Sequence, residues 1–427
     1  MNKTTFMDRT KTKLPANYQR RAKLQLGGLT DDGAPKISKP RILMYSHDTM
    51  GIGHMRRNLL IATQLQKAIP DSNVLIVAGA KEATTFATKA GIDCLTLPSY
   101  SKQSDGTYQS RSLAISVQEI REIRQRTILA AAQGFKPNVF IVDKVPAGLG
   151  GELLPTLNHL ADSQCKLILG LREILDSPEH VERDWKSNRT IETIREYFDE
   201  VWVYGDPDVY DTVNEYSIPK DIQSKVSYTG YLNASSRLSN TKQRPAELRT
   251  PYHLCTVGGG QDGFELAHAF AKAISLTGTN AVLLAGPYMP LDSFRQLVSL
   301  AKKIPSLKVV RFHDEGDLLV KFADRVVAMG GYNTVSAILS HQKNAMIVPR
   351  TSPRVEQWIR AKRLAKLGLI TMQDPRNISA DTIADYLLGD GTVLETVRTT
   401  INLDGLENLT RQLKRSFVKR VAERSSQ

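Results

Sequence analysis

Short apolar runs alternate with longer helix-compatible stretches along most of this chain, and no other feature constrains its fold as strongly. In the first half the apolar runs are nearly continuous, as strands buried on both faces are. The strand-like runs cover residues 74–78, 92–97, 139–143, 166–171 and 201–204, and the helix-like stretches cover residues 81–90, 113–133, 149–162 and 178–198. This alternation predicts an α/β fold with a doubly wound parallel sheet.

The alternation stops at residues 233–250, which are rich in Ser, Asn, Arg and Lys and show no hydrophobic period, and then it starts again. Such a segment is typical of an interdomain linker. The later runs suit strands at residues 253–257, 281–285, 308–312, 325–329 and 345–348, and helices at residues 264–275, 291–303, 334–340 and 355–367. We therefore predict two Rossmann-like domains that face a cleft.

The predicted organisation places a basic extension before the domains and basic helices after them. Its segments are an extension at residues 1–40, a first α/β domain at 41–232, the linker at 233–250, a second α/β domain at 251–390 and C-terminal helices at 391–427. Ligands of open α/β sheets bind beyond the carboxyl ends of the strands, so the predicted site lies in the cleft.

The formal net charge of +13 is concentrated at the two ends of the chain. Residues 1–40 carry +6 and residues 398–427 carry +4, which leaves +3 for the body between them. Basic ends attract anionic membranes or RNA equally well. The chain has no RNA-recognition octamer, zinc finger or basic stripe interleaved with aromatic residues, so we expect no nucleic-acid partner.

The sequence predicts a cytoplasmic protein, because it has no apolar run of about 18 residues and residues 1–40 do not resemble a signal peptide. Its three cysteines, Cys94, Cys165 and Cys255, lie in or beside strand-like runs without metal-ligand spacing, so we interpret them as buried reduced thiols. The helical pattern at residues 406–421 has one apolar face, which we expect to pack on the protein.

A glycine turn at residues 51–53 follows the first apolar run, residues 41–47, and leads into a helical pattern that begins near His54. A strand that ends in glycines and restarts as a helix leaves backbone N–H groups free to bind phosphate or another anion. Gly51 and Gly53 let the backbone approach a ligand, and His54 is placed to act as a base. An ordinary role at a helix start is the alternative for His54.

Three loops of the second half follow predicted strands and should meet on one face of that sheet. The first, residues 258–263, reads G-x-G-x-x-G, the second, residues 330–334, opens a helix, and the third, residues 348–357, ends in a carboxylate and an amide. Backbone N–H groups suit a pyrophosphate, and carboxylates or amides suit ribose hydroxyls. The loops therefore favour a nucleoside diphosphate, and His313, which follows another strand, is a further candidate contact.

A dinucleotide cofactor is disfavoured, because its fingerprint also needs an acidic residue at the end of the next strand. The strands in question end at Gly286 and Ala80 without a carboxylate, and the chain has no P-loop sequence. The D-x-D sequence at Asp206 and Asp208 is interpreted as a turn. We expect neither a metal nor a cofactor.

In this order, the motifs resemble those of the GT-B nucleotide-sugar glycosyltransferases over residues 41–388. The matching sequences are G-x-G-H at the first helix, GGGQDG at residues 258–263, GGYNTVS at residues 330–336, and VPR followed by EQ at residues 348–357. The nearest branch holds the peptidoglycan lipid-intermediate N-acetylglucosaminyltransferase and the diacylglycerol glycosyltransferases. The resemblance implies a metal-independent, inverting transfer, with the nucleotide-sugar in the C-terminal domain and the acceptor in the N-terminal one.

The resemblance also implies roles for individual residues, with His54 as the base or as a contact to sugar or phosphate. The implied donor contacts are Gly259, Gly260 and Gln261 at the pyrophosphate and sugar, Gly331, Asn333 and Thr334 at the diphosphate, and Glu356 and Gln357 at the sugar hydroxyls. The relatives place a ribose-binding Glu where this chain has Ala337. Ribose recognition therefore departs from the family pattern, and Glu356 is the hypothesised replacement.

Asp143 and Arg172 end consecutive strands of the first half and are candidates for acceptor binding, with Asp143 also a candidate for orienting the base. The resemblance and the basic ends favour a lipid or cell-envelope glycan acceptor and an anionic membrane surface as a partner. The expected protein is a cytoplasmic hexosyltransferase, peripheral on the inner face of the plasma membrane, that transfers a hexose or N-acetylhexosamine.

The sequence is also compatible with three other functions. The G-x-G-H-x-x-R sequence at residues 51–57 also resembles the nucleotide-sugar hydrolases of nonulosonic acid synthesis, in which the base would activate water. An epimerase of the same architecture is a second alternative, and a non-catalytic nucleotide-sugar or lipid-binding protein is a third.

Overall fold

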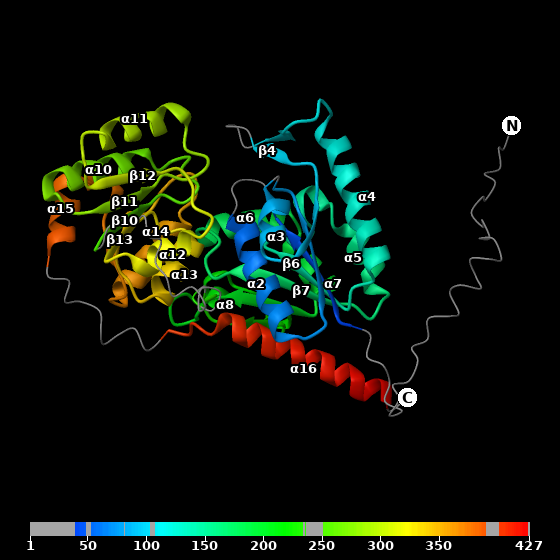
Figure 1. Ribbon diagram of the computed structural model, residues 1–427. Coiled ribbons are helices and arrows are strands. Elements are labelled where there is room, and N and C mark those ends of the chain that lie inside the picture. Colours follow the sequence, from blue (N-terminus) through cyan, green and yellow to red (C-terminus); the bar gives the residue numbers. More distant parts are fainter. Residues whose placement is uncertain are drawn as a thin grey trace. The chain divides into compact units, whose positions relative to one another are not determined.

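The computed structural model describes residues 39–47, 53–80, 82–102, 107–233, 235, 251–389 and 401–425. Within it, residues 41–427 form one compact unit that holds a seven-stranded and a six-stranded parallel sheet. Helices cover both faces of each sheet (Figure 1). The predicted α/β fold with two doubly wound sheets is therefore confirmed.

The N-terminal sheet has the strand order β3-β2-β1-β6-β7-β8-β9. Its strands are β1 (Arg41–Ser46), β2 (Asn73–Ala78), β3 (Asp93–Thr96), β6 (Val139–Asp143), β7 (Lys166–Arg172), β8 (Glu200–Tyr204) and β9 (Val226–Tyr228). The main helices are α2 (Gly53–Ala68), α3 (Ala83–Lys89), α4 (Val117–Phe135), α5 (Leu154–Ala161), α6 (Pro178–Ser187) and α7 (Thr190–Tyr197). Met44 of β1 lies between Ile76 and Ile141 of the neighbouring strands, and all three are fully buried. Burial on both faces explains why this strand is continuously apolar.

The C-terminal sheet has the order β12-β11-β10-β13-β14-β15. Its strands are β10 (His253–Thr256), β11 (Ala281–Leu284), β12 (Leu307–Val310), β13 (Arg325–Ala328), β14 (Asn344–Ile347) and β15 (Thr371–Met372). Its helices are α10 (Phe264–Thr277), α11 (Leu291–Ala301), α12 (Gly316–Phe322), α13 (Tyr332–Ser340), α14 (Glu356–Lys366) and α15 (Ala380–Leu388). In both sheets the order reverses beside the first strand, which places a crevice at the carboxyl ends of the central strands.

The last helix, α16 (Gly405–Ser425), returns to the N-terminal half and packs beside α2 (Figure 1). Its residues Leu406, Leu409 and Leu413 are fully buried. The side chain of Asn408 also donates a hydrogen bond to the carbonyl of Thr229, at 2.8 Å. The apolar face predicted to pack on the protein does so, at Leu406, Leu409 and Leu413.

The structure corrects some local predictions. The single helix predicted at residues 178–198 is two helices, because Arg189 between them adopts a left-handed conformation with φ of 50°. A short hairpin of β4 (Tyr100–Lys102) and β5 (Tyr108–Ser110) and the helix α12 were not predicted at all. Such short elements lack enough residues to show a hydrophobic period.

The described residues also include the D-x-D sequence and the three cysteines. Asp206 accepts hydrogen bonds from the backbone N–H groups of Asp208 at 2.9 Å and Asn402 at 2.7 Å, which confirms that the D-x-D sequence forms a turn. Cys94, Cys165 and Cys255 are free thiols, the last two buried. Among the described residues no helix is long and apolar enough to cross a membrane. Most of the predicted extension and linker, residues 1–38 and 236–250, and the start of the predicted C-terminal helices, residues 391–400, lie outside the described residues.

Candidate active site

A cleft of about 990 Å³ lies along the carboxyl ends of strands from both sheets. Its N-terminal side is formed by the ends of β1, β6 and β7 and by α6, and its C-terminal side by the loops after β10, β11, β13 and β14. Of the predicted site residues that the structure describes, all line this cleft except Asp143, which is buried behind His54. Gly51 lies outside the described residues.

His54 lies in the first turn of α2 and contacts the carboxylate of Asp143 at the end of β6. The distance between His54 Nδ1 and Asp143 Oδ2 is 2.5 Å. Burial by itself would raise the pKa of Asp143, but the positive charge of Arg57 and the hydrogen bonds from His54 and Arg57 hold it well below its usual range. Because Asp143 is ionised, we assign the proton of the imidazole to Nδ1, where it donates to the carboxylate. This leaves the Nε2 lone pair of His54 able to accept a proton.

Arg57 completes this cluster one turn further along α2. Its Nη2 atom donates to Asp143 Oδ1 at 2.5 Å and lies 2.9 Å from His54 Nδ1. The guanidinium also lies near the rings of Tyr204 and Tyr332, at 5.9 and 5.8 Å from their centroids. Burial among these rings and the bond to Asp143 fix Arg57, which therefore orients the carboxylate that orients the imidazole.

Burial lowers the pKa of His54 to about 4, against the opposing influence of the Asp143 carboxylate. The nearby charges of Arg57 and Lys144 act in the same direction as burial. The imidazole is therefore neutral at pH 7, which is the form that a general base needs. His47, at the end of β1, is also buried, and its ring lies edge-on to that of His54 with centroids 6.0 Å apart.

The glycine loop after β10 is folded tightly against the loop after β11. Gly260 has φ of 90°, and a Cβ atom there would lie 2.2 Å from the carbonyl oxygen of Ala285. A Cβ atom on Gly286 would lie 2.5 Å from the backbone of Gly259. Only glycine allows these two backbones to cross so closely, and the crossing places the loop at the cleft with its backbone exposed to a ligand.

The start of α13 forms a second anion-binding element of the C-terminal half. Gly331 is the N-cap residue and supplies no side-chain hydrogen bond to the first turn, which includes Asn333 and Thr334. The N–H groups of that turn therefore remain available to an anion in the cleft. The Asn333 side chain is engaged elsewhere, since its Nδ2 donates to the carbonyl of Gly53 at 2.9 Å. This contact joins the histidine turn of the N-terminal half to the predicted diphosphate loop.

Glu356 and Gln357 at the start of α14 are held by Arg350. Arg350 Nη2 donates to Glu356 Oε1 at 2.8 Å, and its backbone N–H donates to Gln357 Oε1 at 3.1 Å. Arg350 Nη1 also donates to Asp262 at 3.0 Å, which ties this helix to the glycine loop. The second carboxylate oxygen of Glu356, Oε2, is buried without a hydrogen-bond partner among the described residues. It remains able to accept a hydrogen bond from a ligand hydroxyl.

His313, a predicted donor contact, and Ala337, which stands where the relatives have a ribose-binding Glu, also line the cleft. His313, after β12, accepts a hydrogen bond at Nδ1 from the backbone of Glu315, at 3.1 Å. Its carbonyl accepts one from Arg56 Nη2, also at 3.1 Å, which is another contact between the halves. Ala337, the residue that replaces the family's ribose-binding Glu, is fully buried at the edge of the cleft. No carboxylate can act from that position.

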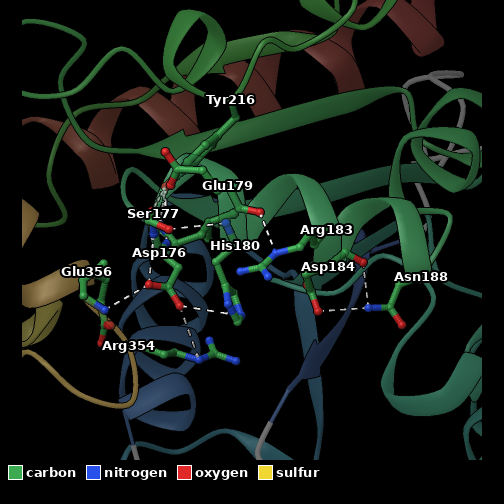
Figure 2. Close-up of polar contacts among 12 residues, drawn as sticks. Asp176, Ser177, Glu179, His180, Arg183, Asp184, Asn188, Tyr216, Arg354 and Glu356 are labelled. Carbon is green, nitrogen blue, oxygen red and sulfur yellow. Dashed lines mark hydrogen bonds and ion pairs between the residues drawn. The ribbon is translucent and has the colours of Figure 1, made fainter.

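Sequence reasoning did not select three features on the N-terminal side of the cleft. These are Lys144, the glycine loop at residues 148–151, and Asp176 before α6. Figure 2 shows Asp176 facing Arg354 and His180. Asp176 also accepts a hydrogen bond from the backbone N–H of Val355, at 2.9 Å. The glycine loop had a usable signal, because Gly148, Gly150 and Gly151 follow a strand as the other cleft loops do. Asp176 had none, because its partner Arg354 is distant in the sequence.

Comparisons with known proteins agree with this architecture. Residues 254–392 match the family model of the glycosyltransferase family 28 C-terminal domain. A comparison with curated protein sequences finds no match.

Among the described residues, no group of three or more His, Cys, Asp or Glu side chains is arranged to hold a metal ion.

Several solved structures have the same fold. MurG of Acinetobacter baumannii is 13% identical with a TM-score of 0.54, and the match covers 88% of this chain and 100% of that one. CalG4, the calicheamicin glycosyltransferase, is 13% identical with a TM-score of 0.54, covering 91% and 98%. A UDP-GlcNAc 2-epimerase from Neisseria meningitidis, bound to UDP-GlcNAc, is 14% identical with a TM-score of 0.59, covering 90% and 100%. The expected GT-B fold is confirmed, and the family match supports a glycosyltransferase.

Proposed function

We propose that this chain, whose second half matches a glycosyltransferase family 28 C-terminal domain, is an inverting glycosyltransferase. It moves a hexose or N-acetylhexosamine from a nucleoside-diphosphate sugar to a hydroxyl group of an acceptor. The observation that carries this proposal is the His54–Asp143 pair, which faces the glycine loops of the other half across one cleft.

His54 acts as the general base in this proposal. Its Nε2 takes the proton of the attacking hydroxyl while Asp143, bound to Nδ1, stabilises the imidazolium that forms. The charge of a bound diphosphate also raises the proton affinity of the imidazole above that of the empty site. The hydroxyl oxygen attacks the anomeric carbon from the face opposite the diphosphate, so the configuration there inverts.

The departing diphosphate is stabilised by the loops of the C-terminal half. Backbone N–H groups around Gly259 and at the start of α13 are fixed before the reaction, so they cost little reorganisation as negative charge develops. Donors of this kind are each worth several kcal/mol, on the order of 3, in transition-state stabilisation. The proposed reaction therefore requires no metal.

A UDP-sugar is the proposed donor, because a structural neighbour with this fold was solved with UDP-GlcNAc bound. Glu356 takes over recognition of a ribose or sugar hydroxyl, since Oε2 has no partner among the described residues and Ala337 offers no carboxylate. The Glu356→Gln variant tests this assignment by isothermal titration with UDP and with the UDP-sugar. Unchanged affinity for both ligands would remove Glu356 from donor recognition.

The function is tested by incubating the protein with a panel of radiolabelled nucleotide-sugars, with and without a membrane lipid extract. Label that moves into lipid or glycan supports transfer, and inversion is read from the anomeric configuration of the product. Free sugar released without an acceptor would indicate hydrolysis, and a changed sugar still attached to its nucleotide would indicate epimerisation. If the protein turns over none of the donors, the result would indicate a non-catalytic binding protein.

His54→Ala tests the proposed base, with His159→Ala as the matched control because His159 is exposed on α5 and does not line the cleft. Loss of a general base lowers turnover by about 10²–10⁴-fold. The control variant should keep the rate of the unaltered protein. A decrease of tenfold or less for His54→Ala would remove it from this role.

We further propose that the acceptor is a lipid or envelope glycan at an anionic membrane surface, where the basic ends of the chain add attraction. The test compares the full chain with one lacking residues 1–36 in sedimentation with anionic vesicles. The full chain should sediment with the vesicles and the shortened chain should do so less. Equal sedimentation would remove the N-terminal extension from membrane binding.

A further inference from the structure

Lys144 and Arg172 line the N-terminal side of the cleft, and neither forms an ion pair with any of the residues that the structure describes. Arg172 ends β7, and its Nε is buried without a hydrogen-bond partner in that same set of residues. Lys144 directly follows β6, and its backbone N–H donates to Gly170 at 2.8 Å. Because β6 and β7 are neighbouring parallel strands, the two cationic residues emerge side by side.

Four other arginine side chains around the cleft are paired with carboxylates. The pairs are Arg57 with Asp143 at 2.5 Å, Arg350 with Asp262 at 3.0 Å, Arg360 with Glu173 at 2.6 Å, and Arg354 with Asp176 at 3.9 Å. Figure 2 shows the last of these, with Asp176 between Arg354 and His180. The carboxylates of Asp143, Glu173 and Asp176 are thus paired with other arginines, whereas Lys144 and Arg172 form no ion pair among the described residues.

This arrangement is costly in the absence of a ligand. Burial and the adjacent charges of Arg354 and Arg172 lower the pKa of Lys144 to about 7, despite Asp143 and Asp184 nearby. Burial and the charges of Arg360 and Arg57 lower the pKa of Arg172 to about 10, against the opposing charges of Glu356 and Glu173. The backbone of Lys144 is also left-handed, with φ of 69°. Cationic groups held together at such a cost are typical of sites for anions.

We propose that Lys144 and Arg172 bind an anionic group of the acceptor, a phosphate or a carboxylate. The inference rests on the proposed function, in which the donor diphosphate occupies the loops of the other half of the cleft. A guanidinium offers a planar pair of donors that matches either oxyanion, and an ammonium adds a point charge. Since Lys144 follows Asp143 in the chain, the anion lies beside the hydroxyl that His54 deprotonates.

The glycine loop at residues 148–151 supports this placement, because its residues 148–150 line the same side of the cleft. Gly148, Gly150 and Gly151 all have positive φ, a backbone conformation that residues with a side chain rarely adopt. A backbone of this kind allows close approach of a large anionic ligand. The proposed acceptor is therefore not any hydroxyl compound. It is one that carries a negative charge close to its reactive hydroxyl.

The first test reads occupancy at Lys144 itself. The full chain is acetylated with acetic anhydride at pH 7 in the presence of inorganic phosphate, pyrophosphate, malonate, UDP or GDP, and the acetylated lysines are quantified by mass spectrometry. Lys302, exposed beyond α11, serves as the internal reference. Protection of Lys144 by phosphate or pyrophosphate indicates a phosphate-bearing acceptor, and protection by malonate indicates a carboxylate-bearing one.

Arg172→Gln should raise the concentration of anion needed for half-protection by about 10- to 100-fold, the loss expected for a charge-assisted hydrogen bond. Arg172→Lys, which keeps the charge, should retain part of the protection and shows that the site still folds. The proposal is overturned if none of the small anions protects Lys144. It is also overturned if UDP or GDP protects Lys144 as strongly as pyrophosphate, because the two cations would then serve the donor.

A second measurement uses the acceptor. Lipid extract is separated by anion exchange, and each fraction is assayed for its ability to accept label from the nucleotide-sugar. Acceptor activity should be retained by the resin, and activity confined to the neutral flow-through contradicts the proposal. Lysine protection does not depend on turnover, so an anion site without any sugar transfer would refute the proposed function alone. Transfer without protection of Lys144 would refute only this inference.

Discussion

Arg360 of α14 and Glu173 after β7 form a fully buried ion pair between the two halves of the protein, with Nε 2.6 Å from Oε1. The same guanidinium donates to the carbonyl of Gly330, beside the start of α13, at 3.3 Å. Tyr231 adds a hydrogen bond to Glu173 at 3.3 Å. The pair therefore fixes the edge of the C-terminal sheet that carries the predicted diphosphate loop against the N-terminal half.

We expect Glu173→Gln to lower the free energy of unfolding by about 3–5 kcal/mol, because it leaves the Arg360 charge buried without a partner. The double variant Glu173→Leu with Arg360→Met should lose less, since it leaves no isolated charge. Urea unfolding monitored by circular dichroism measures both. A single variant as stable as the unaltered protein would show that the pair is not buried in solution.

Asp143→Asn should lower turnover by about 10²–10⁴-fold, because an amide no longer holds the His54 proton on Nδ1 or stabilises the imidazolium. Donor affinity should be unchanged, since Asp143 lies behind His54 and does not line the cleft. Single-turnover assays and titration with the nucleotide separate the two effects. If the variant binds donor weakly while turning over bound donor normally, Asp143 does not act through His54.

Gly260→Ala should weaken binding of the nucleotide at least tenfold, because the added Cβ would lie 2.2 Å from the carbonyl of Ala285 and displace the loop. Gly278→Ala is the matched control, as this residue also has positive φ but has no atom within 4 Å of the added carbon. The control should lose about 1 kcal/mol of stability and keep its affinity. Equal affinities in both variants, measured by titration, would exclude the Gly260 loop from the donor site.

Acidification should destabilise the protein through His54. Its pKa is about 4 in the folded protein and 6.5 unperturbed, so the unfolded chain binds the proton more readily. The stability is full above pH 6.5 and is lost as the pH falls towards 4, by up to about 3 kcal/mol. Unfolding free energies of the unaltered protein and of His54→Gln, measured between pH 7 and 4.5, should converge as the pH falls. Parallel curves would contradict a buried neutral imidazole.

The two-sheet architecture and most strands could be predicted from the sequence because strands buried on both faces leave a nearly continuous apolar signal. The glycine loops at Gly258 and Gly330 could be predicted for a related reason, since glycines between a strand and a helix mark a turn locally. The break at Arg189 and the hairpin at residues 100–110 could not, because they depend on single backbone conformations and on few residues.

Several residues of the candidate site could be predicted from the sequence, but the contacts between them could not. His54 could be selected from its position after a glycine turn, and Asp143 from its position at the end of a strand. Nothing in the sequence shows that these side chains touch, because 89 residues separate them. The hydrogen bond between Asn333 and Gly53 could not be predicted from the sequence either, since it joins opposite sides of the cleft.

Local patterns of hydrophobicity and glycine thus determined the fold class, the position of the cleft and the loops that line it. Only the tertiary structure decided which charges are compensated. It pairs Arg57, Arg350, Arg354 and Arg360 with carboxylates and leaves Lys144 and Arg172 without one among the described residues. The reason is physical: hydrophobic periodicity is a property of neighbours in the chain, whereas an ion pair depends on distances that only the packed fold sets.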